Sequence, residues 1–313
     1  EGIRPSRPLA IATVASQIAI TASPISAAVV FFSNELEKVG VDYVQLLMIA
    51  IPSSFIAVMM GAVVSNFMGK DLKDDPIYQD RLAKGLVKMD FDQDTEKVIP
   101  PEAKRSVLIF AIAIVCVVFY ATAISDTVGL IKNPVRGRDH GIISFMLAAA
   151  TLITFFCKVE SKNILNAPTF KSGMSACICV LGVAWLGTTF VTAHIEEINI
   201  FAGNLLASKP WMLAVVLFFA SMLLYSQAAT TRALMPAALA LGVSPTAAIA
   251  AFAAVSALFV LPTYPSLLAA VEFDDTGSTR IGKYVFDHPF IIPGTATITF
   301  AVILGFIFGG IIL

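Results

Sequence analysis

One arginine stands inside an otherwise uncharged apolar stretch, where its chemistry is suited to binding an anion. Placing Arg232 at mid-bilayer costs roughly 2.5–3.5 kcal/mol, and the apolar segments contain no Asp or Glu to pair with it. We therefore predict that Arg232 pairs with a bound anion. The alternative is that its side chain snorkels to the interface or bonds to backbone carbonyls.

Proline and hydroxyl residues interrupt the apolar stretches at 17–30 and 246–271. Proline removes a backbone donor, and a helix that begins at such a break points free N–H groups and a partial positive charge at the site. We expect helices to begin after Ser26, after Thr231 and after Ser266. The Ser, Thr and Gln side chains at these breaks are neutral donors suited to carboxylate oxygens. Their alternative role is only to hydrogen-bond the backbone groups that the break leaves open. The candidate substrate-binding residues are Ser23, Pro24, Ser26, Ser226, Gln227, Thr230, Thr231, Arg232, Thr263, Tyr264 and Ser266.

The chain shows no sign of catalytic or metal chemistry. The HIEE run at 194–197 is not the HExxH motif of a metalloprotease, and no nucleophile–base pair lies in the apolar segments. We predict no catalytic residue, no metal, no cofactor and no enzyme activity. The four cysteines make no CxxC pair, so we interpret them as reduced small hydrophobes. A net charge of −1 gives no indication of a nucleic-acid partner.

Composition predicts an all-α polytopic membrane protein. Hydrophobic residues make up 57% of the chain and charged residues 14%, with a mean hydropathy of +0.83, whereas soluble domains carry about 25% charged residues. Lipid must therefore be the solvent of most of the chain. The candidate segments are about 9–32, 43–69, 106–125, 141–157, 172–193, 211–242, 246–271 and 290–313.

Two of these segments are not simple spans. Residues 211–242 are too long for one helix and have a polar centre, which is typical of a re-entrant hairpin that enters and leaves on one side. Segment 246–271 is interrupted by Pro262 and Pro265, which cannot both sit in one unbroken helix. With this topology, fifteen of the 21 Lys and Arg fall on one side and five on the other. The richer side should be cytoplasmic and the C-terminus periplasmic.

Residues 70–105 form the one long polar stretch, which we interpret as a solvated cytoplasmic linker between two membrane halves. We also expect 273–283 to be a solvated loop. In the predicted organisation, residues 1–69 are the end of a first repeat, with a broken helix and one span. The linker follows, and residues 106–313 form a second repeat. That second part holds the hairpin 211–242, the broken helix 246–271 and the terminal helix 290–313.

Several long motifs resemble the anaerobic C4-dicarboxylate uptake (Dcu) family, in the order in which that family has them. They are QIAITASPISAAVV at 17–30, FKSGMSACICVLGVAWLG at 170–187, LYSQAATTRALMPAALALGVSP at 224–245, LPTYPSLLAAV at 261–271 and FDDTGSTRIGKYVFDHPFIIPG at 273–294. Among the branches of the family, the sequence looks most like the one that exchanges aspartate, fumarate, malate and succinate.

The resemblance implies an ion-transporter-type fold with two inverted repeats, each a hairpin followed by a broken helix. SQAATT would be the second hairpin tip, PTYPS the second helix break and SPIS the first. The chain would be the C-terminal three quarters of the protein, without the first hairpin. The same resemblance implies a bacterial inner-membrane location and homodimers.

The expected function is C4-dicarboxylate antiport, with fumarate, malate or aspartate exchanged for succinate across the lipid bilayer. The missing intramembrane carboxylates favour an exchanger over a proton-coupled carrier. A sodium-coupled dicarboxylate symporter is the first alternative. The second is a membrane co-sensor that binds the same anion and signals to a sensor kinase.

Overall fold

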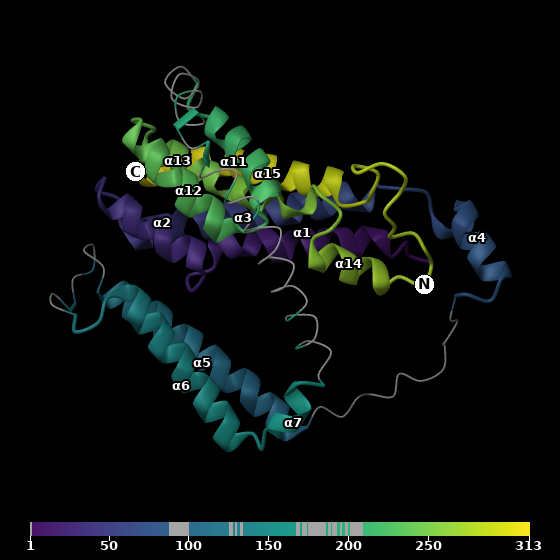
Figure 1. The fold of residues 1–313 in the computed structure, drawn as a ribbon, viewed down its shortest axis with the longest axis horizontal. Helices are drawn as coiled ribbons and strands as arrows, with labels where there is room; N and C mark the ends of the chain where they lie inside the picture. Colours follow the sequence, from purple (N-terminus) through teal and green to yellow (C-terminus); the bar gives the residue numbers. More distant parts are fainter. Residues whose placement is uncertain are drawn as a thin grey trace.

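The computed structural model describes residues 2–87, 100–124, 128, 130–131, 134–166 and 209–313, with isolated positions between 170 and 200. The described residues form helices and no strand (Figure 1), which confirms the all-helical prediction. The expected segment 172–193 lies almost entirely outside them. The helices are α1 Ser6–Ala22, α2 Ala27–Glu37, α3 Tyr43–Asn66, η1 Leu72–Asp74, α4 Pro76–Ala83, α5 Pro101–Ala123, α6 Arg138–Phe156, α7 Ser161–Ile164, α11 Met212–Leu224, α12 Gln227–Ala240, α13 Pro245–Phe252, η3 Ala253–Phe259, α14 Pro265–Glu272 and α15 Ile291–Ile312.

Four stretches of the described residues are long and apolar enough to cross a membrane. The first, Ser6–Glu37, joins α1 and α2 across the break at 23–26. The other three are α3, α5 and α15, while α6, α11 and the α13–η3 stretch are apolar but shorter. These lengths agree with the membrane prediction, and the inverted repeats stay a prediction.

Side-chain caps explain where several helices begin. Ser26 Oγ accepts a hydrogen bond from Val29 N–H at 3.1 Å, and α2 starts at the next residue. Asp42 and Gln45 form a capping box at the start of α3. Ser244 caps α13, whose first residue is a proline that has no N–H to lose.

The main helical body is built on α1, α3 and α15, which pack against one another (Figure 1). Close approach of α3 and α15 depends on a glycine, because a Cβ built at Gly61 would overlap Thr297 Oγ1. The outer faces carry exposed apolar side chains such as Phe55 on α3 and Ile303 on α15. Such faces suit contact with lipid tails.

The α5–α6 pair lies beside this body and contacts it through a small cluster (Figure 1). Val30 of α2, Val117 of α5 and Ile142 of α6 form the buried part of that cluster. Many other apolar side chains of the pair are exposed, Phe119 and Phe155 among them. The pair is therefore joined to the body by little buried surface.

The described part of the 70–105 linker is mostly exposed, but it is docked to the body through one buried ion pair. Arg4 Nη1 forms an ion pair with Asp75 Oδ2 at 2.6 Å, and the two side chains are 10% and 5% exposed. Burial acts to raise the pKa of Asp75, but hydrogen bonds from Ile77 N–H and Arg4, with the charge of Arg4, hold that pKa below its ordinary value. The linker thereby joins the start of α1.

The prediction that 273–283 is a solvated loop is wrong for its polar core. Asp274 is buried and accepts hydrogen bonds from Thr276, from Ser278 Oγ at 2.7 Å and from Thr279 N–H at 2.5 Å. Ser278 Oγ also accepts from Ser6 N–H at 3.1 Å. An Asp-centred turn and the start of α1 therefore hold each other, which composition alone did not reveal.

Candidate functional site

The second break is longer than the sequence predicts. After α13 the chain tightens into the 3₁₀ helix η3, and Ala257 leaves helical geometry with φ −75° and ψ 36°. Helical structure resumes only at Pro265, the first residue of α14, which is two residues earlier than the start expected after Ser266. All residues from 247 to 260 are buried, so this irregular backbone runs through the core of the body.

The turn between α11 and α12, where we predict the tip of a re-entrant hairpin, is shorter than predicted. We call this turn the hairpin tip, and the re-entrant course of 211–242 stays a prediction. Helix α11 ends at Leu224, Tyr225 adopts the left-handed conformation with φ 53°, and Ser226 is extended. The expectation of a helix starting after Thr231 is wrong, because Ser226 Oγ accepts from Ala229 N–H at 3.2 Å and α12 begins at Gln227. The polar residues that looked like a loop form the first turns of a capped helix.

The two threonines of α12 are buried, and their hydroxyls stay within the helix. Thr230 Oγ1 donates to Ser226 O at 2.8 Å, and Thr231 Oγ1 donates to Gln227 O at 2.6 Å. This geometry is the local alternative in which hydroxyls satisfy backbone groups. It leaves Ser226, Gln227 and the helix start as the polar features of this tip.

The hairpin tip and the second break meet. Tyr225 Oη and Thr263 Oγ1 share a hydrogen bond, and the rings of Tyr225 and Tyr264 lie 5.8 Å apart. Ser221 Oγ, one turn before the tip, donates to Ala254 O at 3.1 Å and accepts from Ala257 N–H at 3.2 Å. Two polar interruptions far apart in the sequence thus form one cluster inside the body.

Gln17 of α1 lies at the centre of this cluster. Its backbone carbonyl accepts from Gln227 Nε2 and from Ser256 Oγ, both at 3.2 Å. Its side-chain Nε2 donates to Ser266 Oγ at 3.2 Å, and the residue is only 3% exposed. The remaining side-chain amide atom, Oε1, is buried and has no hydrogen-bond partner in the part of the chain that the structure describes.

Sequence reasoning missed Gln17, although a signal was present. It is an amide in the middle of the apolar stretch 9–32, where a polar side chain needs a partner. The sequence does not tell which way it faces. Ser221, which joins α11 to η3, carried no distinguishing signal, since serine is common in membrane helices.

The first break is confirmed at its predicted place, with α2 beginning after Ser26. Ser26 Oγ donates to Ile20 O at 2.7 Å, and Pro24 O accepts from Tyr43 Oη at 2.9 Å. Ser23 is partly buried. This break is therefore held to α1 and α3. It neighbours the polar cluster of the hairpin tip and the second break, because α2 packs on α12.

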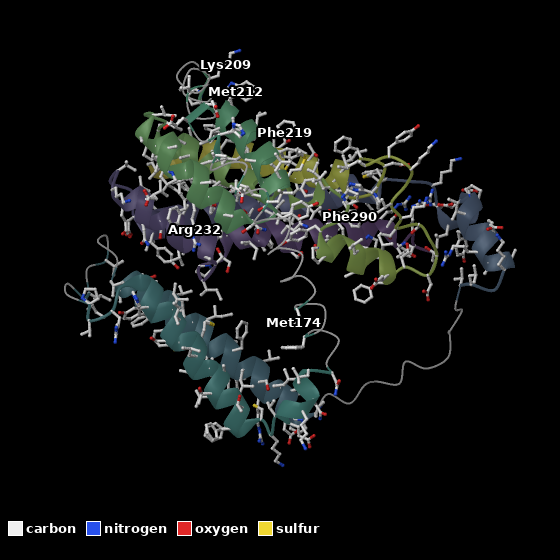
Figure 2. All side chains as sticks on the ribbon, in the orientation of Figure 1. Met174, Lys209, Met212, Phe219, Arg232 and Phe290 are labelled. Atoms are coloured by element: carbon white, nitrogen blue, oxygen red, sulfur yellow. The ribbon has the colours of Figure 1, made fainter. Side chains whose placement is uncertain are left out.

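Arg232 lies on α12 about 9 Å along the helix axis from Ser226. Its side chain is exposed, and its guanidinium lies 5.8 Å from the centre of the Phe31 ring on α2 (Figure 2). Thr230 and Thr231 face the core, so Arg232 projects from another side of the helix. The guanidinium is thus placed along α2 and α12, and its predicted pairing with an anion stays a prediction.

The loop after α14 reaches the second break. His288 is buried, and its Nε2 donates to Val260 O at 3.2 Å. Burial lowers the pKa of His288, and the hydrogen bond to Val260 and the charge of Asp287 oppose that shift. Its other ring nitrogen, Nδ1, is buried and has no hydrogen-bond partner within the described ranges. A neutral imidazole thus satisfies one carbonyl of the irregular segment.

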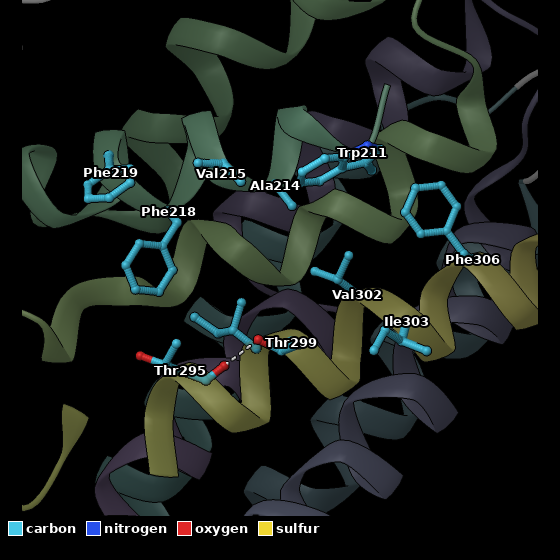
Figure 3. Close-up of a pocket in the computed structure, with 11 residues that line it drawn as sticks. Trp211, Ala214, Val215, Phe218, Phe219, Thr295, Thr299, Val302, Ile303 and Phe306 are labelled. Carbon is cyan, nitrogen blue, oxygen red and sulfur yellow. Dashed lines mark hydrogen bonds between the residues drawn. The ribbon is translucent and has the colours of Figure 1, made fainter. Parts of the chain in front are cut away.

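A large apolar groove lies away from this cluster, between α11 and α15. It has a volume of about 490 Å³, and its walls include Trp211, Phe218 and Phe306 (Figure 3). Thr299 Oγ1 is engaged with Thr295 O of its own helix at 2.8 Å. These walls offer no charged group to a dicarboxylate, so this groove is not the candidate site. No metal-binding group of His, Cys, Asp and Glu occurs among the described residues.

Comparison with known proteins gives this arrangement its context. The sequence profile of the anaerobic C4-dicarboxylate membrane transporter family matches residues 1–313. The chain belongs to this family. Its members are transporters rather than enzymes, and together with the apolar helices this makes the chain an integral membrane protein.

Individual relatives agree with the family assignment. The chain is 63% identical over 313 residues to the C4-dicarboxylate transporter DcuA of Wolinella succinogenes, covering 100% of this chain and 72% of the relative. It is 54% identical over 314 residues to DcuA of Escherichia coli K12, with the same two shares. The anaerobic C4-dicarboxylate transporter DcuB of Escherichia coli O6:H1 is 35% identical over 319 residues, covering 98% and 70%. No solved structure matches.

Proposed function

We propose that this protein is a C4-dicarboxylate antiporter of the bacterial inner membrane, which takes up fumarate, malate or aspartate in exchange for succinate. Its family and relatives carry the names of C4-dicarboxylate transporters. The observation that carries the proposal is the meeting of the hairpin tip with the second helix break, through Tyr225 and Thr263. Discontinuous helices that meet inside a membrane protein are the usual place of substrate in carriers.

The proposed site binds a dianion through dipoles and one charge. The starts of α2, α12 and α14 each present first-turn N–H groups and a partial positive charge. Two carboxylates suit such starts better than one does, since each start accommodates one anionic group. Arg232 supplies the formal positive charge, and the hydroxyls of Ser226, Thr263 and Ser266 supply neutral donors.

Alternating access in this proposal moves the hairpin and broken helix against the scaffold of α3 and α15. The Tyr225–Thr263 contact keeps the tip and the break together, while glycine-mediated packing fixes α3 on α15. Under this proposal the hairpin opens toward the periplasm, the side on which we also place the C-terminus. Arg4, Arg7 and the linker then lie on the cytoplasmic side, as the positive-inside rule requires.

The test uses proteoliposomes loaded with succinate and supplied with labelled fumarate. Arg232→Ala should reduce exchange by about 10- to 100-fold, because a hydrogen bond to a charged group contributes about 1.5–3 kcal/mol. Arg232 is exposed, so the variant should still insert and fold. Lys283→Ala is the matched control, since that exposed cation also lies 5.8 Å from an aromatic ring, that of Tyr284.

The alternatives give different results in the same vesicles. Uptake that needs sodium and no internal succinate would establish the symporter. Fumarate binding without flux would establish the co-sensor. Full exchange by Arg232→Ala would remove the guanidinium from the mechanism and leave the helix starts alone to bind the substrate.

A further inference from the structure

The unpartnered amide oxygen of Gln17 is the least explained polar atom of the candidate site. Gln17 is 3% exposed, and its Oε1 has no hydrogen-bond donor among the described residues. A buried carbonyl without a donor is costly, and native proteins rarely leave one without a purpose. This atom therefore calls for a donor supplied by something other than the described residues.

The surroundings of Gln17 place it between two of the helix starts that we assign to carboxylates. Its side-chain Nε2 donates to Ser266, the second residue of α14. Its backbone carbonyl accepts from the side chain of Gln227, the first residue of α12. A diacid whose carboxylates lie at these starts has its carbon chain beside Gln17. The substituent nearest to the amide would then be the one carried on the carbon next to a carboxylate.

The chemistry of the free atom selects the ligand group. Oε1 only accepts, so an ionised carboxylate cannot satisfy it, whereas an ammonium or a hydroxyl can. Aspartate carries an ammonium at C2 and malate a hydroxyl, while fumarate and succinate carry only hydrogen there. Because the Gln17 amide is neutral, it can accept a hydrogen bond from such a group without repelling the two carboxylates. A Glu at this position would repel them.

We propose that Gln17 is a specificity-determining residue, whose Oε1 accepts a hydrogen bond from the C2 ammonium of aspartate or the C2 hydroxyl of malate. The inference rests on the proposed function, because it concerns the choice among the substrates of that site. Gln17 sets the preference for substituted over unsubstituted C4 diacids. Fumarate and succinate bind without Gln17, through the helix starts, the neutral hydroxyls and Arg232.

The experiment compares labelled aspartate, malate and fumarate in vesicles loaded with succinate, with and without sodium. Gln17→Leu should lower aspartate exchange at least tenfold and malate exchange severalfold, while fumarate exchange stays within twofold of the wild type. Gln17→Glu keeps the acceptor and adds negative charge, so all rates should fall while the ratio of aspartate to fumarate rises. Gln45→Leu, at the α3 capping box, is the control and should leave the substrate ratios unchanged.

A binding readout keeps the proposal testable if transport by a variant is poor. In thermal unfolding of the detergent-solubilised protein, aspartate and fumarate should both raise the midpoint of the wild type. In Gln17→Leu only fumarate should do so. The role of Gln17 would be overturned if Gln17→Leu lowered the exchange of all substrates equally or left the ratio of aspartate to fumarate exchange unchanged. It would also be overturned if the variant changed the sodium dependence of all substrates alike. None of these results would contradict the antiporter itself. A wild type that exchanges no C4 diacid would instead refute the proposed function itself.

Discussion

At the scale of single residues, the hydroxyls of the two interruptions fall into two groups. Those of Thr230 and Thr231 bond to carbonyls one turn earlier in their own helix. Those of Tyr225 and Thr263 bond to each other across two elements, and that of Ser221 bonds both to Phe218 O of its own helix and to Ala254 O of η3. The second group joins the hairpin to the broken helix, so removing one of these hydrogen bonds should destabilise both elements.

The contact between Tyr225 and Thr263 gives a prediction for a double-mutant cycle. Tyr225→Phe and Thr263→Val should each lower the free energy of unfolding by about 0.5–1.5 kcal/mol, the net value of one hydrogen bond. Because both remove the same bond, the double variant should cost less than the two single costs together. Chemical unfolding in detergent, followed by intrinsic fluorescence, measures all four proteins.

Thr299→Val supplies the control for that cycle. Thr299 donates to Thr295 within α15 and is exposed, so its cost should add to that of Tyr225→Phe. Additive costs for Tyr225 and Thr263 would show that their hydrogen bond does not hold tip and break together.

Residue types predicted where the chain breaks, but not which side chains would meet. Pro24 and Pro265 mark interruptions, where proline removes a backbone donor and its ring crowds the preceding turn, whereas Pro52 and Pro236 lie inside α3 and α12. Gln17 and Ser221 acquire their roles only through the faces they present, and those faces depend on how α1 and α11 pack. A local pattern holds no information on that packing.

At the scale of elements, the scaffold depends on how closely two long helices approach. A Cβ built at Gly61 of α3 would overlap Thr297 Oγ1 of α15. Thr297 is fully buried, and its hydroxyl donates to Pro293 O at 2.6 Å. The side chain is thus held in place and cannot easily move aside.

Gly61→Ala should therefore lower the thermal stability of the purified protein, at a cost of about 1–3 kcal/mol for overpacking. Thr297→Ala in the same chain should recover part of that loss, because the overlapping oxygen is gone. Gly310→Ala is the control within α15, where an added Cβ meets nothing within 4 Å. Equal melting temperatures for Gly61→Ala and Gly310→Ala would contradict the close contact of α3 and α15.

The elements were predictable to different degrees. The two apolar arms around 225–226 and the first break follow from hydropathy and proline. The start of α12 did not, because threonines beside a polar centre resemble a loop until Ser226 is seen to cap them. The 3₁₀ run Ala253–Phe259 was also missed, since an all-apolar stretch gives no sign of its helical type.

At the scale of the whole molecule, the linker joins parts that are distant in sequence. Asp75 pairs with Arg4, while Arg81 Nε donates to Asp275 O at 2.9 Å. The linker helix α4 therefore ties the start of α1 to the loop after α14. The sequence could not predict this, because its charged composition is equally typical of a solvated loop.

Asp75→Asn should undock α4. Removing one partner of a buried ion pair costs about 3–5 kcal/mol, so amide hydrogen exchange in residues 70–84 should accelerate at least tenfold. Asp80→Asn removes an exposed pair with Lys84, whose side chains are 59% and 60% exposed, and should change little. Unchanged exchange in Asp75→Asn would show that the pair does not hold the linker.

Acid should mimic that variant. The pKa of Asp75 is lowered in the folded protein, so its stabilising effect is complete above the unfolded value of about 3.8 and is lost as the pH falls through the lower folded value. Exchange in 70–84 should therefore rise below about pH 4, and the Asn variant should lack this step. A step that survives in the variant would point to another acid, such as Asp274.

The hydrogen bond from His288 to Val260 has a consequence for reading variants of this protein. Position 288 looks like an outlying loop residue, yet its imidazole completes the backbone of the interrupted segment that borders Gln17 and Ser221. Replacing it with alanine would orphan a main-chain oxygen in a region shielded from water. We therefore expect defects in solute movement traced to residue 288 to arise from a distorted interior rather than from a lost contact with the solute.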